Sequence, residues 1–133
     1  LLQNGIHIQA LIDWELSTLG PAFIDLSYWC AMLRMQHDWP IGGLGNVNRI
    51  QLGIPPEADL VRQFCTRTGL HKPANWEALI AFQCFRFAAI LQGVRKRQRD
   101  GNASADNAAA VGSQAAPMAT LGAEVLRAHL ATR

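Results

Sequence analysis

Residues 10–28 of the chain read ALIDWELSTLGPAFIDLSY. The stretch begins with the apolar end of a predicted strand, which leads into Asp13. After a turn at Gly20-Pro21, its apolar residues recur at three- and four-residue spacing, which is the pattern of an amphipathic helix. The alternation of apolar and polar residues, typical of a strand, ends before Asp13, and helical spacing of apolar residues begins after Pro21. This change of pattern decides the fold class. We expect a mainly α-helical domain with a short β-hairpin at its N-terminus.

The hairpin is predicted from the residues just before this stretch. Asn4-Gly5 is a strong turn signal, because both residues accept positive φ. Apolar residues alternate with their neighbours from Ile6 onward, so we expect a buried second strand over residues 6–12. An apolar hairpin at the edge of a monomer would be exposed, which makes homo-oligomerisation through it an expectation.

Helical spacing, capping residues and breakers predict the remaining elements. Pro55-Pro56 and Gly69 bound one helix, and Asn75 and Ser104 can cap two others. Gly112 and Pro117 are expected to break or kink the last helix. The predicted helices cover residues 21–36, 57–68, 76–99 and 105–131, and a long loop covers residues 39–56.

Composition limits the function classes. The 133 residues are 50% hydrophobic and 17% charged, which suits one globular domain. A net charge of +2 argues for neither nucleic acid nor a membrane surface, and we expect neither as a partner. The longest apolar run, residues 78–91, is shorter than the roughly 20 residues that span a bilayer.

The three cysteines lie in apolar stretches without C-x-x-C spacing. An odd number of cysteines without a secretory signal favours a reducing compartment, so we expect a cytoplasmic protein whose cysteines are buried. Leu1-Leu2 begins within an apolar pattern, which we interpret as a chain cut from a longer one.

Two carboxylates frame the central stretch. Asp13 follows the predicted strand, and Asp25 lies twelve residues later in the first turn of the next helix. Phosphoryl transfer from ATP uses such carboxylates, because Mg²⁺ prefers a few hard oxygen ligands beside phosphate oxygens and water. The alternative interpretation is that both acids only cap local structure.

Two blocks of the chain resemble the aminoglycoside-phosphotransferase-like kinases. Residues 10–28 are similar to that family's segment strand-Asp-Trp-Glu-x-x-x-x-Gly-Asp-Pro-x-x-Asp-Leu. Residues 85–94, with the turn at residues 101–104, resemble the long helix of one clade, which includes kinase-like domains fused to acyl-CoA dehydrogenases. The resemblance implies that residues 1–133 form the C-terminal, substrate- and metal-binding lobe of a protein-kinase-like fold.

The resemblance also implies residue roles. Asp13 would hold Mg²⁺, and Glu15 would support it or a second metal ion, unless Glu15 is only a turn carboxylate in water. Asp25 would brace the catalytic loop through backbone N–H groups. Where the family has Gly-Asp-Pro, this chain has Gly20 followed directly by Pro21, a departure from the family's pattern in the turn before Asp25.

The family's His-Gly-Asp-x-x-x-x-Asn catalytic loop and its nucleotide-binding lobe do not occur in these residues. We therefore expect the chain to have no kinase activity and no bound cofactor by itself, with Mg²⁺ and ATP bound by the intact protein. The expected substrate is a small molecule with an acceptor hydroxyl, and a hydroxyacyl compound is favoured. The alternative is a non-catalytic helical module for interaction or oligomerisation.

Three further residues are candidates for substrate binding. Arg86 lies on an apolar helix face, where it would either pair with Asp13 or Asp25 or contact an anionic or acyl-type substrate. Trp39 and Trp76 would line the same cleft, unless they are core or rim residues. The basic run at residues 95–99 suits a helix end, with anion binding as the alternative.

Overall fold

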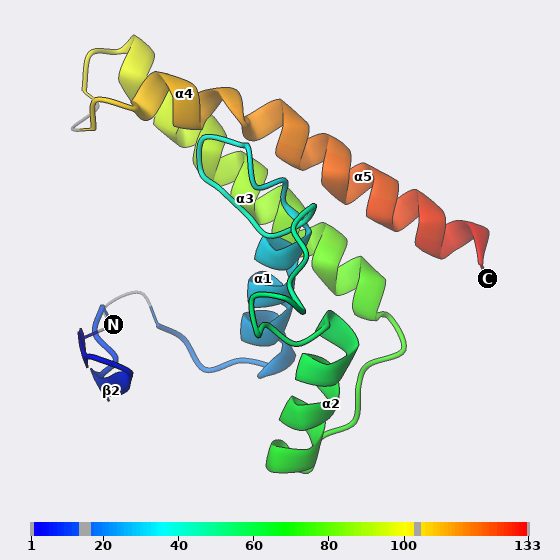
Figure 1. Cartoon of the computed structure of the whole chain (residues 1–133). Helices are drawn as coiled ribbons and strands as arrows, with labels where there is room; N and C mark the ends of the chain where they lie inside the picture. The colour runs from blue at the N-terminus through cyan, green and yellow to red at the C-terminus, as the bar shows by residue number, and fades with distance from the viewer. Residues whose placement is uncertain (1, 14–16, 103–104, 133) are drawn as a thin grey trace.

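The computed structural model describes residues 2–13, 17–102 and 105–132. It is mainly helical, with a two-stranded antiparallel hairpin at the N-terminal end, as the sequence predicted (Figure 1). The described elements are β1 (Leu2–Asn4), β2 (His7–Ala10), α1 (Phe23–Arg34), α2 (Glu57–Thr68), α3 (Trp76–Arg99), α4 (Ala108–Ser113) and α5 (Ala115–Ala131).

The hairpin is shorter than predicted. Asn4 pairs with His7, so the loop consists of Gly5 and Ile6, and Gly5 supplies the positive φ of +59°. The prediction that the second strand continues to Asp13 is wrong, because β2 ends at Ala10, which pairs with Leu2 of β1. The strand is not buried either: the hairpin packs on none of the described helices, and Ile6 is 94% exposed.

Helix α3 is the central element of the helical part. It packs against α1, α4 and α5, whereas α2 contacts α1, and Figure 1 shows α5 running beside α3. The largest fully buried apolar side chains come from α1 or its C-terminal end, from α3 and from α5: Leu33, Met35, Ile80, Leu91 and Met118. Because α3 contributes to the core along most of its length, it sets the positions of α1, α4 and α5.

The expected break in the helix over residues 105–131 is confirmed, because α4 and α5 meet at Gln114, between Gly112 and Pro117; α4 begins only at Ala108. Pro117 has no N–H to donate to the preceding turn, and it lies in the first turn of α5, where proline is tolerated. Gly112 is pressed against α3, since a Cβ there would lie 2.8 Å from the Cα of Arg95. The predicted cap Ser104 lies outside the described residues.

The other helix limits agree closely with the prediction. α2 begins after Pro56, and Gly69 ends it with φ +71° and an N–H donated to the Cys65 carbonyl oxygen at 2.9 Å. α3 has the predicted limits, but Asn75 makes no side-chain capping hydrogen bond, so that cap was wrong. α1 is shorter at both ends than the predicted range 21–36. Residues 39–56 contain no helix or strand, as expected.

By length and composition, α3 is the one helix in the described ranges that could cross a membrane. This is weak support for a membrane span, because the core helix of a soluble protein passes the same test. α3 also packs against three other helices and carries Arg86 near its middle. Such packing is the arrangement of a core helix.

Candidate functional site

Three of the predicted site residues line one pocket. The pocket has a volume of about 480 Å³ and lies where the segment after the hairpin meets the start of α1 and the middle of α3. We call it the carboxylate pocket, and its lining residues are Leu11, Ile12, Asp13, Ser17, Thr18, Ile24, Asp25 and Arg86. The pocket therefore joins two carboxylates, two hydroxyls and a guanidinium from segments that are distant in the sequence.

Asp13 has an unusual backbone conformation. Its φ of +76° makes it the one non-glycine residue with positive φ in the described part of the chain. Aspartate adopts this left-handed region more readily than most residues, but the conformation is still uncommon. The side chain of Asp13 is exposed and lines the pocket.

Asp25 is placed by the first turn of α1. The carboxylate is exposed and lies near the helix N-terminus, where unpaired backbone N–H groups favour negative charge. The residue before the helix, Ala22, makes no side-chain capping bond. Asp25 is thus held by α1 at the wall of the pocket, and within the described ranges no cation lies within 4.0 Å of its carboxylate.

Gln83 joins α3 to the start of α1. Its side-chain amide donates to the Ile24 carbonyl oxygen and to Ser27 Oγ, each at 2.9 Å, and it is completely buried. Its carbonyl oxygen accepts a hydrogen bond of 2.9 Å from Arg86. One glutamine therefore fixes the arginine of the pocket relative to the helix turn that carries Asp25.

Arg86 does not form the ion pair that we considered. In the described ranges, no carboxylate of Asp13 or Asp25 lies within 4.0 Å of its guanidinium. The guanidinium instead donates to Gln83 and lies 5.9 Å from the centre of the Phe82 ring. A guanidinium has five N–H donors, so Arg86 retains donors for an anionic group in the pocket.

The remaining predicted residues lie elsewhere. Trp76 is 2% exposed and its indole N–H donates to Glu57 at 2.9 Å, so it is a core residue. Trp39 is partly buried and packs against the core. Neither tryptophan lines the carboxylate pocket. Glu15 lies outside the described residues.

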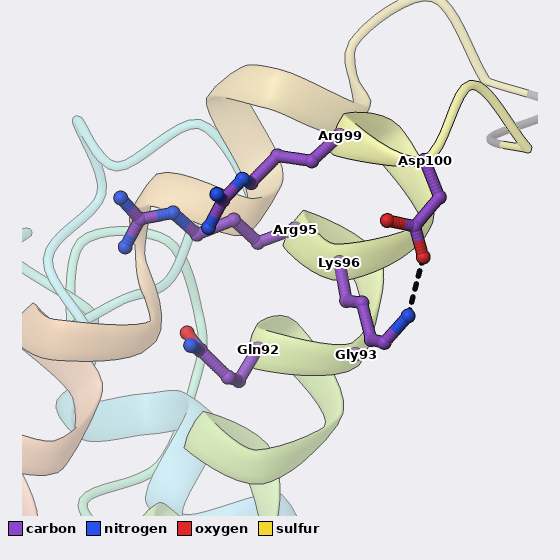
Figure 2. Close-up of a pocket in the computed structure, with 6 residues that line it drawn as sticks. All are labelled: Gln92, Gly93, Arg95, Lys96, Arg99 and Asp100. Carbon is purple, nitrogen blue, oxygen red and sulfur yellow. Dashed lines mark hydrogen bonds and ion pairs between the residues drawn. The ribbon is translucent and has the colours of Figure 1, made fainter.

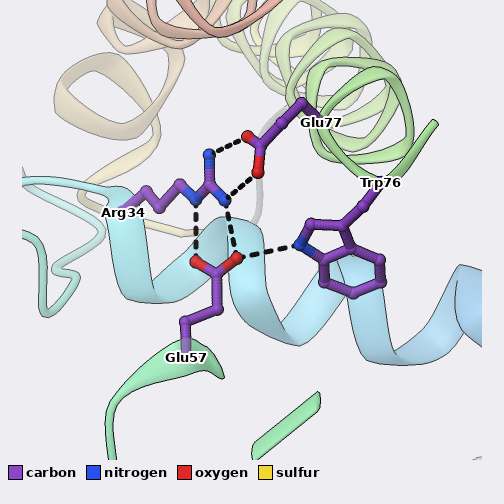
Figure 3. A network of polar contacts seen from close by, with 4 residues as sticks. All are labelled: Arg34, Glu57, Trp76 and Glu77. Atoms are coloured by element: carbon purple, nitrogen blue, oxygen red, sulfur yellow. Dashed lines mark hydrogen bonds and ion pairs between the residues drawn. The ribbon is translucent and has the colours of Figure 1, made fainter. Parts of the chain in front are cut away.

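A polar network between α1, α2 and α3 was missed by the sequence analysis (Figure 3). Arg34 donates through Nε and Nη2 to the two oxygens of Glu57, at 2.8 and 2.6 Å, and through Nη1 to Glu77 at 2.6 Å. Trp76 donates to the same Glu57 carboxylate. The sequence signal for this network was Arg34 itself, a charged residue in an apolar helix, and its position does not indicate which residues it pairs with.

The network shifts the pKa of its charged groups. Burial alone would raise the pKa of Glu57, but the hydrogen bonds from Arg34 and Trp76 outweigh it and lower that pKa below its ordinary value of 4.5. Burial likewise opposes the charge of Arg34, yet hydrogen bonds to Glu57 and Glu77 raise its pKa. Arg34 and Glu57 are thus stabilised in their charged forms, and the network links α1, α2 and α3.

The donor set of the carboxylate pocket suits magnesium in part. In the described residues, no group of three or more His, Cys, Asp or Glu side chains could hold a metal ion. Mg²⁺, however, is commonly held by one or two carboxylates, with phosphate oxygens and water completing its octahedron. Asp13 meets this requirement, and Asp25 lines the same pocket.

The fold and pocket define a helical chain with an acidic site beside an arginine. The chain is similar to segments of acyl-CoA dehydrogenase family proteins. It is 40% identical over 116 residues to acyl-CoA dehydrogenase family member 10 of Mus musculus, covering 86% of the chain and 11% of that protein. It is 31% identical over 127 residues to family member 11 of Rattus norvegicus, covering 95% and 16%.

A probable acyl-CoA dehydrogenase of Arabidopsis thaliana is 36% identical over 103 residues, covering 74% of the chain and 12% of that protein. The chain thus spans between a tenth and a sixth of the length of these curated relatives. They support the predicted link to acyl-CoA dehydrogenase fusions. No family model matches the chain, and no solved structure matches it, so the kinase assignment stays a prediction.

Proposed function

We propose that this chain is the metal- and substrate-binding part of an ATP-dependent phosphotransferase that acts on a hydroxyl group. One observation carries the proposal: Asp13, Asp25 and Arg86, three residues singled out from the sequence, line a single pocket. Two carboxylates and one guanidinium around an open pocket suit a metal–phosphate complex, because each ionic group finds a counter-charge there.

Each residue has a distinct proposed role. Asp13 holds Mg²⁺ with Glu15 in support, and its uncommon backbone conformation is of the kind that clusters at functional sites. Asp25 braces the catalytic loop of the intact protein. Arg86, held by Gln83, orients an anionic group of the substrate. Mg²⁺, when bound, neutralises phosphate charge during transfer.

The proposed acceptor is a small molecule with a hydroxyl group, and a hydroxylated acyl compound is favoured. The relatives named as acyl-CoA dehydrogenases support this choice, because a fused kinase would act on related acyl compounds. The catalytic base and the ATP-binding lysine would come from parts of the protein beyond these 133 residues. The chain alone is therefore expected to transfer no phosphate.

The test is the Asp13→Asn variant of the intact protein. Asparagine keeps the size of aspartate and tolerates positive φ, so the variant removes charge with little backbone strain. We expect it to bind Mg²⁺–ATP at least about tenfold more weakly, as loss of a charged ligand implies. Binding is measured by calorimetric titration of ATP with and without Mg²⁺.

Asp59→Asn is the matched control, because Asp59 lies in α2 and does not line the carboxylate pocket. It should bind Mg²⁺–ATP like the unaltered protein. Equal affinity in the Asp13 variant and the control would remove Asp13 from the metal site. Phosphate transfer by the isolated chain above a buffer control would contradict the expected inactivity.

The second candidate is a non-catalytic interaction or oligomerisation module. It is favoured by the exposed hairpin, where Ile6 and Ile8 are 94% and 67% exposed. Pairing of two hairpins would cover these side chains and the free edge of a strand. Mass measurement by light scattering would distinguish the two: a dimer that Ile8→Lys dissociates supports the module, and a monomer at all concentrations contradicts it.

A further inference from the structure

A second open pocket lies on the C-terminal part of α3 (Figure 2). It has a volume of about 570 Å³, and we call it the arginine pocket. Figure 2 shows Arg95 and Arg99 extending to the same side of the helix, with Gln92 one turn earlier. The residues that line it are Gln92, Gly93, Arg95, Lys96, Arg99 and Asp100.

The charges in this pocket are unbalanced. Lys96 forms an ion pair with Asp100, so these two charges compensate each other. In the described ranges, no carboxylate lies within 4.0 Å of the guanidinium of Arg95 or Arg99. Guanidinium groups stay charged at all physiological pH values, and like charges on one face repel. Two positive charges are therefore available to one anion.

The helix end explains only part of this arrangement. Cations in the last turn of a helix are stabilised by its negative end, and Lys96, Arg97 and Arg99 lie there in α3. That effect falls off beyond the last turn. It does not account for Arg95 and Gln92, which precede the last turn and yet line the same pocket as Arg99.

The base of the arginine pocket is held firmly. A Cβ on Gly112 would lie 2.8 Å from both Cα and Cβ of Arg95, so α4 touches the α3 backbone at this residue. This contact fixes the main chain from which the Arg95 side chain extends. The backbone therefore needs no ordering when a ligand binds, and the cost of binding is the rotamer freedom of the exposed Arg95 and Arg99 side chains.

We propose that the arginine pocket binds the phosphate group of a small molecule, as a site separate from the carboxylate pocket. A phosphate monoester dianion carries about two negative charges at neutral pH and matches the two uncompensated guanidinium groups. Each guanidinium can donate two parallel hydrogen bonds to phosphate oxygens, and the Gln92 amide supplies another donor.

The test uses the 133-residue chain and glycerol 3-phosphate as the probe. Arg95→Gln and Arg99→Gln should each weaken binding by about tenfold, as expected for a lost hydrogen bond to a charged group. Arg97→Gln is the matched control, because it removes the same charge from the same basic run but does not line the pocket. It should change the dissociation constant by less than about twofold. Titration is followed by NMR of the arginine Nε–H signals.

Several results would overturn the proposal. Equal losses in all three variants would indicate a diffuse positive surface, and undetectable binding to the unaltered chain would exclude the site. Vesicles of phosphatidylcholine with and without phosphatidic acid test a lipid source: binding to these alone would exclude a soluble ligand. Circular dichroism verifies folding. Asp13→Asn should leave glycerol 3-phosphate binding at the arginine pocket unchanged. The two proposals can therefore fail independently of each other.

Discussion

Gln83 and Ile24 are 59 positions apart, and the side-chain amide of Gln83 donates to the Ile24 carbonyl oxygen at 2.9 Å. The bond fixes α3 against the first turn of α1, beside Asp25. Because the donor is completely buried, water cannot replace it. The bond therefore fixes α1 and α3, the two helices that line the carboxylate pocket, relative to each other.

Replacing Gln83 by Leu should destabilise the chain. The substitution keeps the volume but removes the bonds to Ile24, Ser27 and Arg86, and we expect a loss of about 1–2 kcal/mol in unfolding free energy. Urea denaturation measures it. Gln63→Leu, at an exposed position of α2, is the control and should change stability little. Equal stability of Gln83→Leu and the unaltered chain would contradict the bridging role.

The Arg34 network should contribute more to the free energy of unfolding than a surface ion pair does. Glu57 accepts three hydrogen bonds from Arg34 and Trp76 while only 18% of its side chain is exposed. Glu57→Gln should therefore cost about 2 kcal/mol of unfolding free energy. Arg62→Met breaks the exposed pair with Asp59 and should cost less than about 0.5 kcal/mol. Similar losses in both variants would argue against a special role for the network.

Stability should fall with acid through Glu57. Its pKa is lower in the folded chain than the ordinary 4.5, so the carboxylate stabilises the fold fully above that pH. Below pH 4.5 the unfolded chain takes up the proton first, and the contribution is lost as pH falls towards the folded pKa. The stability difference between the unaltered chain and Glu57→Gln, measured from pH 7 to pH 3, should shrink. A constant difference would contradict the pKa shift.

The cysteines should react unequally with alkylating reagents. Burial, and then the Glu57 carboxylate, raise the pKa of Cys30 to about 12, and burial raises that of Cys84 to about 11. Thiolate is the reactive form, so neither should react in the native chain at pH 8. Cys65 is partly exposed and should be labelled alone. Mass spectrometry should show one modification in buffer and three in urea; native labelling of Cys30 would contradict the packing.

Gly122 should tolerate no side chain. A Cβ there would lie 2.8 Å from the Cβ of Cys84 and 3.2 Å from the Ala81 carbonyl oxygen, so Gly122→Val should destabilise the contact of α3 with α5 by about 1–3 kcal/mol. Gly93→Ala is the control, because its Cβ would meet only the tip of Arg97 at 3.6 Å. Alanine is also the better helix former, so this variant should gain about 0.5–1 kcal/mol. The midpoint of thermal unfolding should fall for Gly122→Val and rise for Gly93→Ala.

The elements bounded by strong local signals could be predicted from the sequence. Pro55-Pro56 and Gly69 gave the limits of α2, and helical spacing gave those of α3. A break in the last helix was predicted from Gly112 and Pro117, but its position at Gln114 accompanies the contact of Gly112 with Arg95 of α3, which no local pattern gives. Likewise, β2 ends at Ala10 although the apolar pattern continues to Ile12, so alternation alone does not give the end of the strand.

Asp13 and Asp25 were singled out by their positions after a strand and at a helix start, and Arg86 by its place on an apolar helix face. The structure places all three around one pocket, while their roles stay predictions. The buried state of Trp76 depends on its partner Glu57, nineteen positions away, and no spacing rule gives that contact. Long-range hydrogen bonding is therefore the part of this site that the sequence leaves undetermined.

Helix α3 carries both pockets, with Arg86 lining one and Arg95 the other. At a rise of about 1.5 Å per residue, these positions are roughly 13 Å apart along the axis. One residue inserted between them would lengthen this spacing slightly but turn one pocket by about 100° against the other. The helix thus fixes both the distance and the relative direction of the two pockets. Substitutions between the pockets are therefore easier to accommodate than an insertion or a deletion.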